Sequence, residues 1–174
     1  MSKNNIKQLL VTVGTTKFEN LIKNIDKDEF YETIIKHNFK KLIIQKGTGE
    51  YIPKQYEKYT NKIDIQICTI LNNFENIIKQ SDLIISHAGA GILLESLKNK
   101  RNVIVCVNDT LMDNHQIELA YSLDKENYVH YCKNLNEIVN DVKLILESKK
   151  KIKIYPEFNY DAIPNVIYSM LGIN

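Results

Sequence analysis

Short apolar runs alternate along the chain with segments in which apolar residues recur every three or four positions. The runs are rich in β-branched residues and have the length of strands, whereas the wider spacing is typical of one helix face. The runs predict strands near 9–13, 42–44, 63–67, 83–85, 103–107 and 128–131. The wider spacing predicts helices near 18–25, 28–37, 72–78, 92–97, 114–125, 135–146 and 163–171.

This alternation predicts an α/β fold, a Rossmann-like and mostly parallel sheet with helices on both faces. The run 103–107 is apolar at every position, as expected of a strand that is covered on both sides. Ile63, Ile65 and Ile67 alternate with polar residues, so one face of that strand should be less buried. Asn72 and Asn73 are plausible helix caps, and the tyrosine-rich segment around Pro53 gives no clear prediction.

Length, charge and hydropathy narrow the class of protein. A chain of 174 residues is enough for one domain with a sizeable core. The net charge is only +2 and Arg101 is the only arginine, which argues against nucleic-acid binding. No apolar stretch approaches the roughly 20 residues that span a bilayer, and the polar start at 1–5 does not resemble a signal peptide. We expect a cytosolic protein without a membrane span of its own.

The cysteines and histidines do not predict a metal site. The chain has an odd number of cysteines, Cys68, Cys106 and Cys132, and none of them has CxxC spacing. Each lies in or beside an apolar run, so we expect buried, reduced thiols. His87 and His115 lack HxxxH spacing and an acidic cluster. We therefore expect neither a metal nor another cofactor.

Ligands of such folds bind beyond the carboxyl ends of strands, and three of these junctions carry polar or glycine-rich residues. At the first, Gly14 would let the backbone approach a ligand, and the hydroxyls of Thr15 and Thr16 could donate to phosphate or sugar oxygens. The alternative is a simple turn with threonine caps.

The second junction, His87-Ala88-Gly89-Ala90-Gly91, leads into a helix. The unpaired amides and the dipole of a helix start form an anion site that suits a diphosphate, although a tight turn would have similar residues. No Lys-Ser/Thr follows, as a P-loop requires, and the third glycine of a GxGxxG motif is absent. Glu95 could accept hydrogen bonds from two ribose hydroxyls, or could simply be favourable near a helix start.

The third junction, 108–116, is a polar loop that ends at a helix start. The donors and acceptors of Asn114, His115 and Gln116 suit the hydroxyls of a sugar, although Asp113 or Asn114 could simply cap the helix. A lysine cluster at 149–153 is either a solvated helix end or a contact for an anionic lipid or acidic partner surface.

Together, "VTVGTT", "SDLIISHAGAGILLESL" and "VIVCVNDTLMDNHQIELA" resemble the glycosyltransferase family 28 C-terminal domain over residues 7–131. Within that family the chain looks like the donor-binding, catalytic subunits of two-subunit UDP-N-acetylglucosamine transferases. The resemblance implies the C-terminal, donor-binding half of a GT-B enzyme. It implies transfer of N-acetylglucosamine to dolichyl-diphosphate-N-acetylglucosamine with inversion, the second step of N-glycan precursor synthesis.

The resemblance also assigns roles to residues. Gly89 and Gly91, flanked by His87 and Ala88, would lie against the diphosphate, and Glu95 would hold the ribose. Gly14, Thr15 and Thr16 would edge the same cleft, and Leu71 would lie near the uracil. The expected sugar contacts are Asn114, His115 and Gln116. His87, His115 and Asp113 lie near the expected cleft, but the general base stays unassigned because it could lie on the acceptor half.

The length of the chain supplies one half of a GT-B enzyme, since each half needs roughly 150–200 residues. The resemblance implies that a membrane-anchored partner supplies the acceptor half and recruits this chain to the cytosolic face of the endoplasmic reticulum. We expect residues 1–150 to form the UDP-sugar-binding domain and 151–174 a tail and helix that dock the partner. The alternatives are a non-catalytic nucleotide-binding module that regulates a partner, and a UDP-sugar transferase with a different acceptor.

Overall fold

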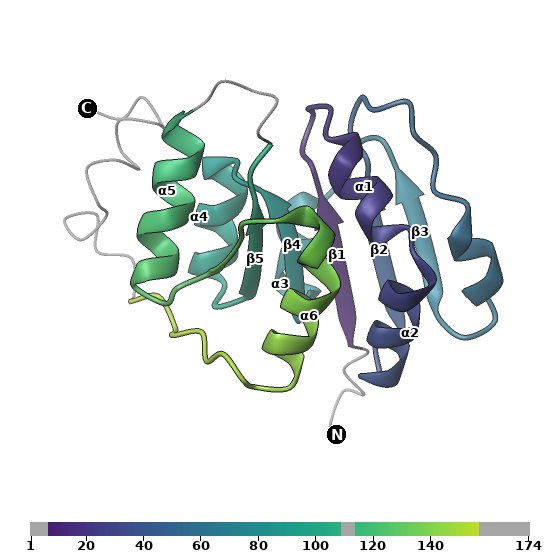
Figure 1. The fold of residues 1–174 in the computed structure, drawn as a ribbon. Helices are drawn as coiled ribbons and strands as arrows, with labels where there is room; N and C mark the ends of the chain where they lie inside the picture. Colours follow the sequence, from purple (N-terminus) through teal and green to yellow (C-terminus); the bar gives the residue numbers. More distant parts are fainter. Residues whose placement is uncertain (1–6, 109–113, 157–174) are drawn as a thin grey trace.

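A sheet of parallel strands forms the centre of the computed structural model, which describes residues 7–108 and 114–156 (Figure 1). The order across the sheet is β3-β2-β1-β4-β5-β6, and every neighbouring pair is parallel. The strands are β1 (Gln8–Thr12), β2 (Lys41–Gln45), β3 (Asp64–Cys68), β4 (Leu83–His87), β5 (Asn102–Cys106) and β6 (His130–Cys132). The predicted Rossmann-like fold is therefore confirmed.

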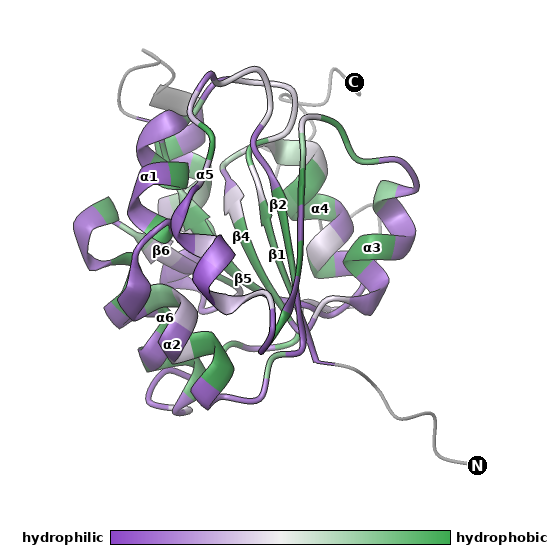
Figure 2. Ribbon diagram, turned by 90° about the vertical axis from the view of Figure 1, so that its right-hand side faces the viewer, coloured by the Kyte–Doolittle hydropathy of each residue, from purple (hydrophilic) through white to green (hydrophobic). Residues whose placement is uncertain are grey.

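Helices cover both faces of this sheet. The helical elements are α1 (Glu19–Ile25), α2 (Asp28–Lys36), η1 (Gln55–Tyr59), α3 (Phe74–Gln80), α4 (Ala90–Lys98), α5 (Asn114–Lys125), η2 (Leu135–Glu137) and α6 (Ile138–Leu146). Buried residues of α1, α2 and α6 pack in one core cluster, and those of α3, α4 and α5 pack in the other. Figure 2 shows α2 and α6 on one side of the hydrophobic strands, and α3 and α4 on the other.

Successive strand residues point to opposite faces, so each central strand contributes to both cores. In β1, Leu9 and Val11 join the cluster that holds α1, α2 and α6, whereas Leu10 joins the other cluster. In β5, Ile104 and Val105 are divided between the two clusters in the same way, and both are fully buried. This two-sided burial explains why the run 103–107 is continuously apolar.

Several local predictions needed correction. The predicted strand 128–131 is shorter and shifted, because only His130–Cys132 pairs with β5. Asn73 does occupy the N-cap position of α3, but its backbone is left-handed and its side chain makes no capping hydrogen bond. Cys106 and Cys132 are buried free thiols as expected, whereas Cys68 on the edge strand β3 is partly exposed. The alternation of Ile63, Ile65 and Ile67 is confirmed, since the intervening Asp64 and Gln66 are exposed whereas the isoleucines are buried or partly buried.

The segment around Pro53, which gave no clear prediction, is held by a distant carboxylate. Asp26, buried after α1, accepts hydrogen bonds from the hydroxyls of Tyr31 and Tyr51 at 3.0 and 2.8 Å. It also accepts from the backbone amides of Lys54 and Gln55 at 2.8 and 3.0 Å. Burial and these carboxylate contacts raise the pKa of Tyr51 to about 12, so its hydroxyl stays a donor. One carboxylate therefore fixes the course of the chain into η1.

After α6 the chain crosses to the α5 side of the sheet. The Lys150 ammonium contacts the Asp124 carboxylate and lies 3.1 Å from Nδ1 of His130. Tyr155 is nearly buried, and its ring packs edge-on against Tyr128 with centroids 4.7 Å apart. The predicted helix 163–171 lies outside the described residues. Within residues 7–108 and 114–156, no helix has the length and apolar composition that crossing a bilayer requires.

The strand order reverses between β1 and β4, which lie side by side at the centre of the sheet (Figure 1). Their connecting helices leave toward opposite faces, because α1 packs in one core and α4 in the other. Such a switch point leaves a crevice outside the carboxyl ends of the two strands, where open α/β sheets bind ligands. The loops after β1 and β4 are the first two junctions that the sequence singled out.

Candidate functional site

A cleft of about 380 Å³ lies at this switch point. It is formed by the loops after β1, β3 and β4 together with the first residues of α3 and α4 and the end of β2. Its lining residues are Gly14, Thr15, Thr16, Gln45, Ile70, Leu71, Phe74, His87, Gly89, Gly91 and Ile92. The cleft thus brings together Gly14, Thr15, Thr16, Leu71, His87, Gly89 and Gly91, all of which the sequence singled out.

The turn after β1 is held by a chain of hydrogen bonds that starts inside the sheet. The Thr12 hydroxyl donates to Oε1 of Gln45, and the Gly14 amide donates to the Thr12 hydroxyl oxygen at 3.2 Å. The hydroxyl of Thr16 donates to the Val13 carbonyl at 2.9 Å, so its oxygen keeps acceptor capacity. Gly14 has φ +63°, a left-handed conformation that favours glycine. The backbone of the turn is therefore fixed before any ligand arrives.

A second loop supports this turn from behind. The Thr48 amide donates to the Thr16 carbonyl at 3.2 Å. A Cβ on Gly47 would lie 2.0 Å from that same carbonyl oxygen, and the φ of Gly47 is +61°. Only glycine allows this approach without displacing one of the two loops.

His87, at the end of β4, fills the space that two glycines leave. A Cβ on Gly14 would lie 2.8 Å from Cε1 of the His87 ring, and a Cβ on Gly89 would lie 2.5 Å from its Nε2. The sequence attributed Gly89 to the close approach of a ligand, but the structure gives it an intramolecular reason, the packing of this ring. A Cβ on Gly91, by contrast, would meet nothing within 4 Å.

The His87 ring is mostly buried, and this has an electrostatic consequence. Burial lowers the pKa of His87 below its ordinary value, and the backbone of Thr12 only partly opposes this effect. Its Nδ1 is buried without a hydrogen-bond partner among the described residues. At neutral pH the cleft wall therefore presents a neutral imidazole.

The start of α4 points its amides into this region. Gly89 is the N-cap with extended backbone angles, and Ala90 and Gly91 are the first two helical residues. The Gly89 carbonyl accepts from the amides of Ile92 and Leu93, both at 3.1 Å. The amides of Ala90 and Gly91 precede the first residues that can bond within the helix. They and the helix dipole provide the partial positive charge of an anion site.

Two residues of the same motif lie away from the cleft wall. Ala88 is buried in the core with α3, α4 and α5. Glu95 lies in the second turn of α4, and its Oε1 accepts from Nδ2 of Asn99 at 2.7 Å. Since α4 has no acidic residue in its first turn, Glu95 is the carboxylate of this helix that lies nearest its start, one turn inside it.

The third junction is described only in part. Asn108 is buried, and its Nδ2 donates to the Lys17 carbonyl at 3.1 Å, which ties the loop after β5 to the loop after β1. Asp113 lies outside the described residues, as do the side chains of Asn114 and His115, whose backbone begins α5. Gln116 is partly exposed on α5 and is not among the residues that line the cleft.

Several residues of the wall were not predicted from the sequence, namely Gln45, Ile70, Phe74 and Ile92. Gln45 carried a usable signal, since it is a polar residue at the end of an otherwise apolar strand and is almost fully buried. Ile70 is unusual for a large apolar side chain because 65% of it is exposed. Phe74 and Ile92 begin helices in an ordinary amphipathic pattern, which concealed their position at the cleft.

Comparison with known proteins agrees with this geometry. The chain is 36% identical over 127 residues to the mouse UDP-N-acetylglucosamine transferase subunit ALG13, which covers 73% of this chain but only 11% of that protein. The chain is thus similar to a small part of the mouse protein. The solution structure of an ALG13 superposes with a TM-score of 0.68 and 25% identity, over 95% of this chain and 97% of the other.

A bacterial enzyme extends the likeness in fold to a two-domain glycosyltransferase. MurG of Acinetobacter baumannii superposes with a TM-score of 0.66 at 15% identity, covering 99% of this chain and 54% of MurG. The chain therefore has the fold of one half of a GT-B enzyme. Residues 8–159 match the glycosyltransferase family 28 C-terminal domain. From this match and from the cleft at the β1–β4 switch point, we conclude that the chain belongs to the glycosyltransferase family 28 C-terminal domain family.

Proposed function

We propose that this chain is the donor-binding subunit of a UDP-N-acetylglucosamine transferase. In this proposal it transfers N-acetylglucosamine from UDP-N-acetylglucosamine to a lipid-diphosphate-linked N-acetylglucosamine, dolichyl-diphosphate-N-acetylglucosamine in eukaryotes. The similarity to proteins named UDP-N-acetylglucosamine transferase subunit supports the donor. The observation that carries the proposal is the cleft itself, which combines a helix start, a fixed glycine-threonine turn and an apolar wall.

The diphosphate fits best at the start of α4. The first amides of this helix provide donors and a positive dipole end, which favour an anion. Gly91 leaves open space beside them, since no atom lies within 4 Å of the position of a Cβ. Thr15 and Thr16 line the same cleft. The Thr15 hydroxyl would be a further donor to a phosphate, whereas the Thr16 hydroxyl already donates to the Val13 carbonyl.

The uracil fits the apolar side of the cleft. Ile70, Leu71 and Phe74 come from the loop after β3 and the start of α3, and Ile92 comes from α4. A planar base buries both faces against such side chains, and this burial contributes affinity in proportion to its apolar area. In this orientation the ribose lies between base and diphosphate, with Glu95 as its proposed partner and Ala88 as a backbone support. The N-acetylglucosamine extends toward Asn114, His115 and Gln116.

Catalysis by this chain would consist mainly of stabilising the leaving group. The 4-hydroxyl of the acceptor sugar attacks the anomeric carbon, the bond to the diphosphate oxygen breaks, and the anomeric centre inverts. Negative charge grows on UDP as that bond breaks, so preorganised amides at Ala90 and Gly91 favour the transition state. The neutral His87 ring keeps the turn and the helix start apart at a fixed spacing. The base that accepts the hydroxyl proton stays unassigned.

A second protein completes the enzyme in this proposal. The chain corresponds to about half of a two-domain fold, so a membrane-anchored partner would supply the acceptor-binding half. Residues 1–150 would form the donor-binding domain, and 151–174 would dock the partner. The partner would bring the chain to the cytosolic face of the endoplasmic reticulum, where its lipid-linked acceptor resides.

A reconstituted assay tests the proposal. The chain, with and without the candidate partner, is mixed with UDP-N-acetylglucosamine and a short-chain lipid-diphosphate-N-acetylglucosamine, and the product is identified by mass spectrometry. We expect transfer only when both proteins are present, and loss of transfer with Gly91→Val, which fills the open space beside the helix start. Nucleotide binding without transfer to any acceptor would contradict the proposal and favour a regulatory nucleotide-binding module.

A further inference from the structure

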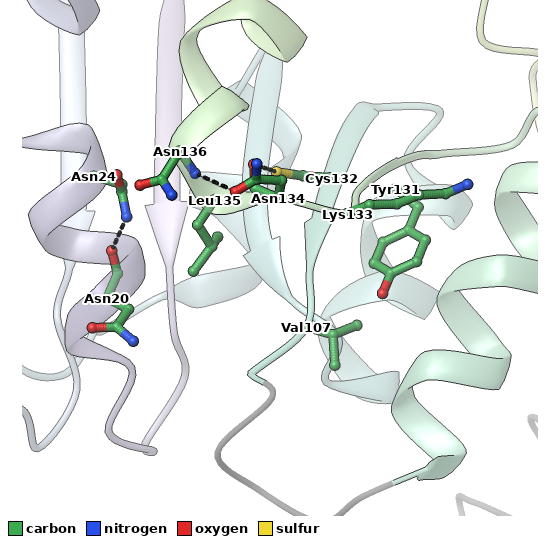
Figure 3. A pocket seen from close by; sticks show the side chains of 9 residues that line it. All are labelled: Asn20, Asn24, Val107, Tyr131, Cys132, Lys133, Asn134, Leu135 and Asn136. Carbon is green, nitrogen blue, oxygen red and sulfur yellow. Dashed lines mark hydrogen bonds between the residues drawn. The ribbon is translucent and has the colours of Figure 1, made fainter.

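A second, polar pocket of about 370 Å³ lies between α1 and the start of η2 (Figure 3). Four asparagines line it, with Asn20 and Asn24 on α1 and with Asn134 and Asn136 at the start of η2. Lys133 adds an ammonium, and none of the lining residues in the described part of the chain is acidic. Figure 3 shows Asn136 extending toward Asn24 across the gap between these elements.

This pocket lies at the carboxyl edge of the sheet, as the first cleft does. Val107 and Cys132, which follow or end β5 and β6, contribute to its wall. Lys17, whose carbonyl accepts a hydrogen bond from Asn108, lies between the residues of the two sites along the chain. Gly14–Thr16 line the first cleft just before Lys17, and Asn20 and Asn24 line the polar pocket just after it.

Part of the polar lining is already held in place. Nδ2 of Asn24 donates to the Asn20 carbonyl at 3.0 Å, and its Oδ1 accepts from the Lys27 ammonium at 2.7 Å. Oδ1 of Asn134 accepts from the Asn136 amide at 3.1 Å and so caps η2. These bonds fix two of the carboxamides without a ligand.

Other polar groups of the pocket are still available. Among the residues that the structure describes, the side chains of Asn20, Lys133 and Asn136 have no hydrogen-bond or ion-pair partner. A carboxamide offers both a donor and an acceptor, which matches the hydroxyl and N-acetyl groups of a sugar. An ammonium without a nearby carboxylate matches a phosphate. The lining therefore suits a neutral, hydroxyl-rich ring that carries an anionic substituent.

We infer that this polar pocket binds the sugar of the acceptor, an N-acetylated hexose whose anomeric position carries phosphate. This inference rests on the proposed function and deepens it, because it gives the donor-binding chain direct contacts to the acceptor. Asn20 and Asn136 hold the ring hydroxyls and the N-acetyl group, and Lys133 faces the phosphate. Along the chain, Lys17 stands between the donor turn at Gly14–Thr16 and the first residue of this pocket, Asn20.

A binding titration followed by ¹⁵N–¹H correlation NMR tests the inference on the full chain. The probe is N-acetylglucosamine 1-phosphate, added to the protein already saturated with UDP. We expect amide shifts at Asn20, Asn24, Asn134 and Asn136. The double variant Asn20→Ala/Asn136→Ala should weaken probe binding by about tenfold, because two hydrogen-bonding carboxamides are lost.

The matched control is Asn61→Ala, an exposed asparagine before β3 at the opposite edge of the sheet, which should bind the probe like the wild type. Melting temperatures of all variants should agree, since Asn20 and Asn136 are exposed. Unchanged affinity in the double variant, or shifts confined to the first cleft, would overturn the inference. The same shifts with inorganic phosphate alone would also overturn it, by reducing the pocket to an anion site at Lys133.

The preceding titration with UDP separates the two proposals. Shifts at Gly14, Gly89 and Gly91 on adding UDP support the donor site, whatever the probe then does. Their absence would contradict the proposed function. The polar pocket would still be tested on its own, because binding of N-acetylglucosamine 1-phosphate is compared between the wild type and the asparagine double variant.

Discussion

Gly89 and Gly91 stand two residues apart in one motif, yet they serve different purposes. The sequence motif assigned both to a ligand. A Cβ on Gly89 would lie 2.5 Å from Nε2 of His87, whereas one on Gly91 would meet nothing within 4 Å. The motif could be recognised from the sequence, but the division of roles could not, because it depends on the position of a ring in three dimensions.

This difference gives a prediction with opposite signs for two alanine variants. Gly89→Ala should destabilise the fold by about 1–3 kcal/mol through overpacking against His87. Gly91→Ala should keep the stability or raise it by up to about 1 kcal/mol, since alanine favours a helix. It should nevertheless weaken UDP binding by about tenfold or more, because a methyl group enters the open space. Thermal unfolding and titration calorimetry measure the two effects.

A rescue variant identifies the cause of the first effect. The double variant His87→Ala/Gly89→Ala removes the ring that the new methyl would meet. Its loss in the free energy of unfolding should therefore be smaller than the sum of the losses in the two single variants. Equal stability of Gly89→Ala and Gly91→Ala would contradict the account.

His87 also gives a prediction for pH. Burial lowers the pKa of this side chain in the folded protein, so the unfolded chain binds a proton more readily. Stability is therefore complete above the ordinary pKa of 6.5, and it falls as the pH drops from there through the folded value. The wild-type free energy of unfolding, measured with urea at several pH values, should fall more steeply below about pH 6.5 than that of His87→Gln. If the free energies of unfolding of the two proteins fell in parallel with pH, His87 would not be the source of the pH dependence.

At the scale of elements, the sequence predicted best where the determining residues are local. The strands β1, β4 and β5 are apolar because both faces are covered, and this pattern is visible within five residues. The helix at 114–125 was predicted with its exact bounds. The bounds of β6 and the structure around Pro53 were not predicted correctly, because the course of both segments depends on residues far away in the sequence. Asp26 is the clearest of these.

Asp26→Asn tests how far one carboxylate organises the segment 51–55. The carboxylate accepts from two hydroxyls and two amides, whereas a carboxamide would oppose some of these donors with its own NH₂ group. We expect a loss of about 2–3 kcal/mol in the free energy of unfolding, measured with urea. Asp64→Asn is the control, because Asp64 is exposed on the edge strand β3. A loss no greater than that of the control would count against the account.

At the scale of the whole molecule, the candidate cleft is assembled from loops that lie far apart in the sequence. The sequence identified Gly14–Thr16 and His87–Gly91 separately, and the parallel sheet joins them because β1 pairs with β4. The roles proposed for Glu95, Asn114, His115 and Gln116 remain predictions. Glu95 and Gln116 are not among the described residues that line the cleft, and the side chains of Asn114 and His115 lie outside the described part of the chain. Under the proposed function, their positions relative to a ligand would depend on the donor and on the proposed partner.

The proposed docking role of the C-terminal region leads to a truncation with a defined start. Tyr155 packs against Tyr128, so a chain that ends at Pro156 keeps this contact. It should retain its melting temperature and UDP binding, yet fail to co-purify with the membrane-anchored partner. A chain that ends at Lys150 should also melt at a lower temperature, since it lacks Tyr155. Undiminished co-purification of the chain that ends at Pro156 would refute the docking role.

The order of the strands also determines when the cleft can appear during synthesis. The first three strands, β1, β2 and β3, are neighbours in the sheet and leave the ribosome together. The other neighbour of β1 is β4, so the buried edge of β1 must wait until the residues after Gln80 have been translated. Until then the nascent chain presents one unpaired edge of a strand whose five residues are all buried in the folded protein. The cleft therefore cannot form until β4 has paired with β1, after the first three strands are complete.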